Sequence, residues 1–383
     1  MEPLVPRYGS GSLADVVPSL LAGLGVPGMV DVLGIGGASR VCVLLVDGLG
    51  WQLLREHEAD APFLASLAGS PITAGFPSTT ASSLAALGTG MPTGEHGLVG
   101  YSFAEGDEVL NALRWSRYGA PEHVDLRDVL VPEQVQPRRT AFEAAADAGV
   151  AVRLVLPRDQ RGSGLTRAAL RGGRFQGVLG FGDLVTRVGQ ALRSADRVLC
   201  YAYHADLDAL GHVHGPGSAA WRWQLRFVDR LAAAVADELP AGGALVVTAD
   251  HGMVAADDRV DYDTDDVLRD GVRALGGEAR VRHVYTADPE GVRERWSRRL
   301  GDRAWVASRA EAVAAGWFGP RVADHVLPRV GDVVVAARGS LVVVRSVVEP
   351  GLTAFVGHHG SLTAEEQHIP VLVATGTGVG GSA

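Results

Sequence analysis

The sequence predicts an α/β protein with a mostly parallel central sheet and helices on both of its faces. Three apolar runs of strand length support this prediction, at 41–46, 198–203 and 244–249. Continuous apolar runs are typical of strands that are buried on both faces, as in parallel sheets. Helical patterns lie between the runs, and alternating strands and helices build sheets of this kind.

Other segments continue the alternation. The further expected strands are 151–156, 332–336, 341–344 and 371–374. The expected helices are 61–68, 82–87, 183–194 and 218–239. In the last helix, Leu225, Val228, Leu231 and Val235 recur at steps of three and four residues, which predicts one apolar face.

Two segments fit the alternation poorly. Residues 101–139 are rich in Trp, Arg and Pro, and residues 257–331 are rich in charge. A chain of 383 residues fits two domains or one large α/β domain with insertions. We expect a single domain over 1–383, in which both segments are cap-like insertions.

The composition and net charge limit which kinds of binding partner are expected. Hydrophobic residues make up 47% of the chain and charged residues 21%, which is typical of globular proteins. The formal net charge of −9 gives no general attraction for nucleic acid or anionic membranes, so neither is an expected partner. No apolar run approaches the roughly 20 residues that span a bilayer, and no signal peptide is visible at the start. The expected location is the cytoplasm, and the oligomeric state stays open.

The two cysteines, Cys42 and Cys200, lie in strand-like runs. Buried free thiols are expected there, because two such residues do not indicate a disulfide framework.

Polar clusters follow the three main apolar runs. Asp47-Gly48 follows the first run, and Asp250-His251 follows the third. The second run continues into 204–216, which carries several aspartates and histidines. In open α/β sheets, functional sites lie at the carboxyl ends of strands.

A fourth cluster, His358-His359, lies near the end of the chain. Taken singly, Asp-Gly after a strand is an ordinary turn, and adjacent histidines occur on plain surfaces. Four such clusters together favour a metal site, because carboxylate and imidazole are the ligands that suit zinc or manganese.

The segment 75–101 contains hydroxyl residues at the start of an expected helix, Ser78, Thr79 and Thr80. A hydroxyl at this position can lie beside an anion, because helix N-termini present free backbone N–H groups. Capping of the helix by Ser78 or Thr79 explains the same pattern.

The order of these motifs resembles the alkaline phosphatase superfamily, and within it the nucleotide pyrophosphatase/phosphodiesterase (type I phosphodiesterase) family. The motifs that carry the resemblance are VDG, PSTT, GTG, HG, DALGHVHGP, ADHG and HHG, over most of the chain from Val43 to about Ala374. The resemblance implies an alkaline-phosphatase-like three-layer sandwich with two divalent metal ions.

Residue by residue, the resemblance implies two ligand sets and a nucleophile. The proposed metal ligands are Asp47, Asp250 and His251 for one ion and Asp208, His212 and His359 for the other. Asp206 lacks the family's spacing, and His359 is preferred over His358 because the family's histidine directly precedes a glycine. The resemblance implies that Thr80 is the nucleophile and also contacts a metal, with Thr79 as the alternative.

The register supports Thr80, which lies three residues after Pro77 and nine before Thr89. The family's asparagine, which contacts a phosphoryl oxygen, falls at Tyr101 in this chain. Tyr101 is therefore a candidate for contact with the substrate. Because a tyrosine stands where the family has an asparagine, the substrate preference stays open.

The function implied is metal-dependent hydrolysis of phosphodiester or pyrophosphate bonds in small molecules such as nucleotides, through a covalent phospho-threonine. Zinc is the expected metal and manganese suits the same ligands. The alternatives are a phosphomonoesterase or phosphonate hydrolase of the same superfamily and a non-catalytic metal- or phosphate-binding protein. A monoesterase needs a further cation, for which Arg114, Arg117 and Arg158 are candidates.

Overall fold

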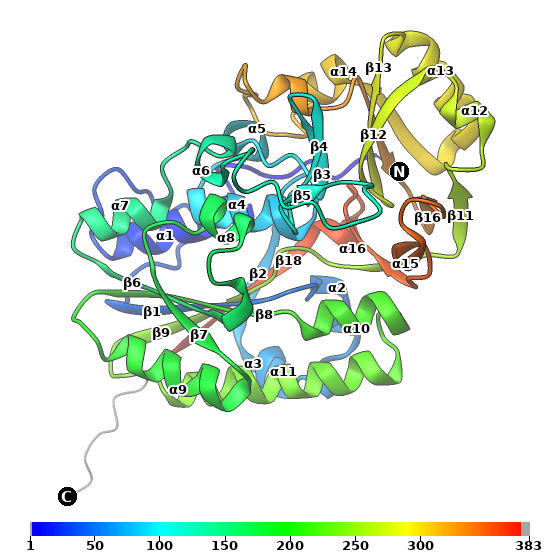
Figure 1. The fold of residues 1–383 in the computed structure, drawn as a ribbon. Coiled ribbons are helices and arrows are strands. Elements are labelled where there is room, and N and C mark those ends of the chain that lie inside the picture. The colour runs from blue at the N-terminus through cyan, green and yellow to red at the C-terminus, as the bar shows by residue number, and fades with distance from the viewer. Residues whose placement is uncertain (1, 377–383) are drawn as a thin grey trace, which may run out of the picture.

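A seven-stranded sheet forms the centre of the computed structural model, which describes residues 2–376 (Figure 1). Its strand order is β2-β18-β9-β1-β8-β6-β7. In chain order, the strands are β1 (Arg40–Val46), β2 (Ala68–Thr73), β6 (Ala151–Pro157), β7 (Arg174–Val178), β8 (Val198–His204), β9 (Gly243–Thr248) and β18 (His368–Thr375). The five strands from β9 to β7 are parallel, and β18 is antiparallel to both β9 and β2. The mostly parallel sheet is confirmed.

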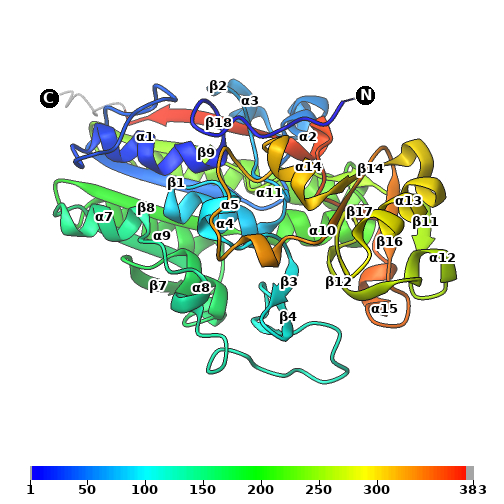
Figure 2. The same cartoon turned by 90° about the horizontal axis from the view of Figure 1, so that it is seen from above.

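Helices cover both faces of this sheet, as the two ribbon views show (Figures 1 and 2). One face carries α3 (Pro62–Ser66), α9 (Phe181–Leu192) and α11 (Ala219–Asp237). The other carries α1 (Val16–Gly23), α4 (Thr80–Thr89), α7 (Ala141–Asp147) and α8 (Gly164–Ala169). The three-layer prediction is confirmed. The expected helix 61–68 is too long, because Ala68 already pairs with Val373 as the first residue of β2.

The segments outside the alternation form small sheets at the carboxyl end of the central strands. A three-stranded sheet contains β3 (Ser102–Glu105), β4 (Glu108–Asn111) and β5 (Ser116–Arg117). A four-stranded sheet contains β12 (Val272–Glu278), β13 (Val281–Thr286), β14 (Ala304–Ser308) and β15 (Val333–Ala337). Two strand pairs complete the set, β10 (Val254–Ala255) with β17 (Gly357–His358) and β11 (Asp258–Asp261) with β16 (Leu341–Val344). The expected strands 332–336 and 341–344 therefore lie outside the central sheet.

Short helices connect these elements. They are α2 (Trp51–Glu56), α5 (Thr93–His96), α6 (Pro132–Val135), α10 (Asp206–His214), α12 (Asp266–Arg269), α13 (Pro289–Leu300), α14 (Arg309–Ala314), α15 (Pro350–Thr353) and α16 (Ala364–Gln367). Five 3₁₀ turns complete the described chain, at η1 (Leu13–Asp15), η2 (Glu58–Asp60), η3 (Arg158–Gln160), η4 (Gly301–Arg303) and η5 (Leu327–Arg329). No helix among the described residues is long and apolar enough to cross a membrane.

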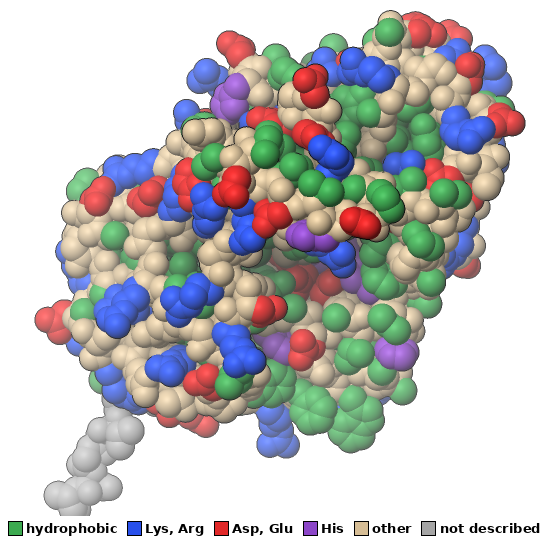
Figure 3. Space-filling view, viewed as in Figure 1, with side chains coloured by type: hydrophobic (Ala, Val, Ile, Leu, Met, Phe, Trp, Pro, Cys, Tyr) green, Lys and Arg blue, Asp and Glu red, His purple; other side chains and the backbone are tan. Residues whose placement is uncertain are grey.

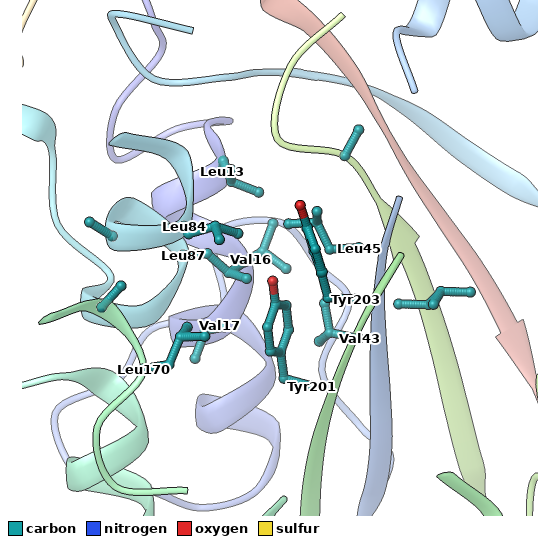
Figure 4. Packing of buried hydrophobic residues seen from close by; sticks show 14 of the residues in the cluster. Leu13, Val16, Val17, Val43, Leu45, Leu84, Leu87, Leu170, Tyr201 and Tyr203 are labelled. Carbon is teal, nitrogen blue, oxygen red and sulfur yellow. The ribbon is translucent and has the colours of Figure 1, made fainter. Parts of the chain in front are cut away.

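The core between the sheet and α4 fixes where that helix begins. Leu84 and Leu87 pack with Val43 of β1 and with Tyr201 and Tyr203 of β8 (Figure 4). Every residue of α4 is buried, and most of its side chains are small. Small side chains let neighbouring backbones approach closely, so α4 packs tightly against the elements around it.

Close packing of α4 is most evident at Gly88, where a Cβ atom would lie 1.9 Å from the carbonyl oxygen of Ala169. A larger residue at this position would push α4 away from α8.

The remaining core features agree with the sequence patterns. The predicted apolar face of α11 is buried at all four positions, Leu225, Val228, Leu231 and Val235. Both cysteines are free and fully buried, and Cys42 lies opposite Cys200 in the register of β1 and β8.

Candidate active site

The first group of candidate ligands lies where β1 and β9 end. Asp47 follows β1 directly, and Asp250-His251 follow β9 by one residue. The Nε2 atom of His251 lies 3.3 Å from Asp47 Oδ1 and 3.4 Å from Asp250 Oδ2. All three side chains are buried. The parallel neighbours β1 and β9 thus bring residues that are about 200 positions apart into contact.

The second group is built by α10 and by the segment after β17. Asp208 and His212 lie one turn apart on α10, which follows β8 after one residue, and His212 Nε2 is 3.2 Å from Asp208 Oδ2. His359 follows β17, and its Nε2 atom is 3.3 Å from that of His212.

The two groups adjoin each other. The rings of His251 and His359 stack with centroids 3.5 Å apart and planes 11° apart. The two ligand groups therefore form one continuous cluster of carboxylate and imidazole side chains.

The carboxylates have the free acceptor atoms that cations require. Asp47 Oδ1, Asp208 Oδ1 and Asp250 Oδ2 are buried and have no hydrogen-bond partner in the described part of the chain. A buried oxygen without a partner is costly, and a bound cation removes that cost.

The histidines are oriented for the same purpose. In each of the three histidines, Nδ1 faces a backbone carbonyl oxygen. The distance is 3.0 Å from His251 to Gly252, 2.8 Å from His212 to Gly357 and 2.9 Å from His359 to Ser78. Donation from Nδ1 to a carbonyl leaves the Nε2 lone pair free, which is the usual arrangement of metal-binding histidines. The residues present therefore fit two divalent cations with nitrogen and oxygen ligands.

Burial of the carboxylates is the largest influence on the electrostatics of the site, followed by their charges. Burial, and then the charges of Asp250 and Asp208, raise the pKa of Asp47 well above its ordinary value. Burial also raises the pKa of Asp250. Although burial opposes the shift, the neighbouring Asp208 carboxylate raises the pKa of His212 to about 9. Without cations, the site therefore retains protons that metal binding must displace.

Thr80 and Thr79 point to different partners at the start of α4. Thr80 is the first residue of the helix, and its hydroxyl oxygen lies 3.4 Å from His251 Nε2. The Thr79 hydroxyl instead donates to Glu278 Oε2 at 3.3 Å. Ser78 donates to the carbonyl of Ser361, and no side chain caps the helix. The alternative explanation by capping is therefore wrong.

A cavity of about 350 Å³ opens over the second ligand group and the start of α4. In Figure 3 it is the hollow in the middle of the face, with acidic and histidine side chains inside it. Thr79, Thr80 and Tyr101 line the cavity together with ligands of the second group. Burial, and then the charge of Glu349, raise the pKa of Tyr101 to about 12, so its hydroxyl keeps its proton at neutral pH.

The structure separates the weaker candidates. Asp206 is exposed and belongs to neither ligand group. His358 lies next to the site, but its Nε2 atom is 3.1 Å from the carbonyl of Phe355, and it also belongs to neither group. Arg117 pairs with Glu108, and Arg158 lines another surface hollow, whereas Arg114 lines the cavity.

Two residues of the site escaped the sequence analysis. Glu278 ends β12 inside the segment 257–331, where no motif distinguishes it from other acidic residues. Tyr203 lies in β8, and its hydroxyl donates to Asp47 Oδ2. The only feature of the sequence that could have indicated this contact is the position of Tyr203 directly before the polar segment 204–216.

Comparison with known proteins identifies the family of the chain. A model of the type I phosphodiesterase / nucleotide pyrophosphatase family matches residues 41–362. The chain belongs to this family. Family membership makes it a hydrolase of the phosphodiesterase and nucleotide pyrophosphatase type, as the sequence motifs predicted. Comparison with curated proteins by sequence finds no match.

Solved structures of the same fold include ectonucleotide pyrophosphatase / phosphodiesterase 5 from mouse and human. Identity is 16% and the TM-score 0.65 for both, with 87% of each chain covered for the mouse protein and 88% for the human protein. An inactive threonine-to-alanine variant of the mouse protein, in complex with AMP, gives a TM-score of 0.66 at 16% identity, with 87% of both chains covered. These similarities establish the alkaline-phosphatase-like fold.

Proposed function

We propose that this protein cleaves phosphodiester or pyrophosphate bonds of small molecules with two divalent metal ions and Thr80 as nucleophile. The observation that carries the proposal is the position of the Thr80 hydroxyl. Thr80 lines the cavity at the N-terminus of α4, and its hydroxyl lies next to His251. A hydroxyl that attacks phosphorus needs neighbouring groups that stabilise the negative charge developing during the reaction.

Asp47, Asp250 and His251 would hold one ion, and Asp208, His212 and His359 the other. When bound, the ions lower the pKa of the nucleophile and stabilise the charge that develops on the phosphoryl oxygens. Three imidazoles among six ligands favour zinc, and manganese accepts the same donors.

The chain's own groups define two chemical steps. In the first, Thr80 Oγ loses its proton to solvent and bonds to phosphorus, while the bond from phosphorus to the leaving oxygen breaks. The leaving oxygen keeps the electron pair and takes up a proton. In the second, water bonds to phosphorus, the bond from phosphorus to Oγ breaks, and Thr80 recovers a proton. Free N–H groups at the start of α4 favour the anionic phosphoryl group in both steps.

The mouse relative supports nucleotides as a substrate class. That protein is inactive when a threonine is replaced by alanine, and the variant was obtained in complex with AMP. Both facts agree with a threonine nucleophile and a nucleotide product in the present chain.

Turnover of bis(4-nitrophenyl) phosphate tests the proposal. The protein is stripped with a chelator and reloaded with zinc or with manganese in parallel. We expect hydrolysis only after reloading. Bound metal without turnover of diesters, monoesters or nucleotides would contradict the proposal and favour the alternative, a non-catalytic binding protein.

A further inference from the structure

Three arginines line the cavity, and two of them are already paired. Arg282 forms an ion pair with Glu349 at 3.3 Å, and Arg345 forms one with Asp263 at 3.0 Å. Arg114 is exposed at the cavity wall, and no carboxylate of residues 2–376 lies within ion-pair distance of it. Arg114 is therefore the cavity arginine whose charge is available to a ligand.

The backbone around Arg114 is fixed. The Asn111 side-chain oxygen accepts hydrogen bonds from the backbone N–H groups of Leu113 at 3.1 Å and Arg114 at 3.0 Å. The backbone N–H group of the next residue, Ala112, donates to the backbone carbonyl of Tyr101 at 2.8 Å. These backbone contacts keep Arg114 and Tyr101 in a fixed arrangement, and both residues line the cavity.

The charge balance indicates what this arginine does. A phosphodiester carries one negative charge, which the two cations and the N–H groups of α4 already offset. A further guanidinium is unnecessary for a diester, but it suits a substrate with a second anionic phosphate oxygen, because arginine binds such oxygens with paired hydrogen bonds.

We infer that Arg114 is a specificity-determining residue that binds a second anionic phosphate oxygen of the substrate. This inference rests on the proposed function and deepens it. The second charge belongs either to the reacting phosphoryl group, as in a phosphate monoester, or to an adjacent phosphoryl group, as in a pyrophosphate. In both cases, the enzyme prefers substrates with more than one phosphate charge over simple diesters.

Arg114→Gln tests the inference, and Arg117→Gln is the matched control. Both arginines are exposed in the same segment, but Arg117 pairs with Glu108 and does not line the cavity. The values of kcat/KM are measured for bis(4-nitrophenyl) phosphate, 4-nitrophenyl phosphate and ATP. We expect Arg114→Gln to lower the ratio of kcat/KM for a multiply charged substrate to kcat/KM for the diester. The expected decrease is about ten- to hundredfold, as for the loss of a hydrogen bond to a charged group. Arg117→Gln should leave these ratios unchanged.

The three substrates separate the two sources of charge. A loss confined to 4-nitrophenyl phosphate assigns the second charge to the reacting group, and a loss confined to ATP assigns it to the neighbouring group. Equal ratios in the wild type and both variants would overturn the inference.

Binding of inorganic phosphate to the metal-loaded protein, measured by calorimetry, gives a readout without turnover. Arg114→Gln should weaken it at least about tenfold, whereas Arg117→Gln should not. Unchanged phosphate affinity in Arg114→Gln would overturn the inference even in a protein without turnover. Loss of turnover with intact, Arg114-dependent phosphate binding would contradict the proposed function alone.

Discussion

The hydroxyl oxygen of Thr80 lies 3.4 Å from the Nε2 atom of His251. The hydroxyl of the preceding threonine, Thr79, donates to Glu278 instead. Two adjacent hydroxyls at one helix terminus therefore have different environments, and only that of Thr80 contacts the first ligand group. This difference distinguishes Thr80, the proposed nucleophile, from Thr79 more directly than the sequence register does.

The two threonines should differ in their response to substitution. We expect Thr80→Ala to lower kcat for bis(4-nitrophenyl) phosphate by at least about a thousandfold, because the group that bonds to phosphorus is lost. Thr79→Ala removes one hydrogen bond to Glu278 and should cost less than about tenfold. Steady-state kinetics of both variants with the same metal provide the comparison. Comparable losses in the two variants would argue against Thr80 as the nucleophile.

Metal content should follow the two ligand groups. We expect two ions per chain in the wild type and about one in Asp250→Asn and in His359→Gln, because each removes a ligand from one group. His358→Gln is the control, since His358 belongs to neither group, and it should retain both ions. Elemental analysis after gel filtration measures the content. Two ions in all four proteins would mean that the ligand groups are assigned wrongly.

Tyr203 and Tyr201 provide a second matched pair. They lie two residues apart on the same face of β8 (Figure 4), but within residues 2–376 only the Tyr203 hydroxyl has a hydrogen-bond partner, Asp47. We expect Tyr203→Phe to weaken metal binding by about 10- to 100-fold, as for the loss of other hydrogen bonds that orient a ligand. Tyr201→Phe should bind metal like the wild type. Competition with a coloured chelator measures both affinities, and equal affinities would show that Tyr203 does not orient Asp47.

The buried His283 should make the protein sensitive to acid. Burial lowers its pKa from 6.5 to about 4, and the Nε2 and Nδ1 atoms both have backbone partners, at Val99 and Gly331. Between pH 6.5 and about 4, the unfolded chain binds a proton that the folded chain does not. Stability therefore falls as the pH falls through this window.

The contribution of His283 can be measured by urea unfolding at pH 7.5 and pH 5. We expect it to account for about 2 kcal/mol of the decrease in the free energy of unfolding at pH 5. His283→Gln should therefore show a smaller decrease than the wild type, although its stability at pH 7.5 is lower. The same decrease in both proteins would contradict the assignment.

The sequence predicted the central layers better than the segments over the site. The runs that became β1, β8 and β9 are continuous and apolar, since both of their faces are buried, and such runs are recognisable without a structure. The six proposed metal ligands follow short motifs, and the structure brings them together in two groups.

Other parts of the site depend on contacts that sequence does not encode locally. Glu278 and Arg114 reach the cavity from β12 and from the turn after β4, in the two segments without clear periodicity. Their importance depends on which distant residues they meet, and strand pairing in those segments is set by tertiary packing. Only the folded chain shows that Arg282 forms an ion pair with Glu349, whereas Arg114 has no ion-pair partner among residues 2–376.

The most direct test of the central claim is capture of the covalent intermediate. The zinc-loaded protein is mixed with bis(4-nitrophenyl) phosphate, quenched in acid within the first turnover, and analysed by peptide mass spectrometry. If Thr80 is the nucleophile, we expect a 4-nitrophenyl phosphoryl group on Thr80 and none in Thr80→Ala. A phosphoryl group on Thr79 or another residue, or hydrolysis with no protein-bound phosphorus at any time, would contradict it.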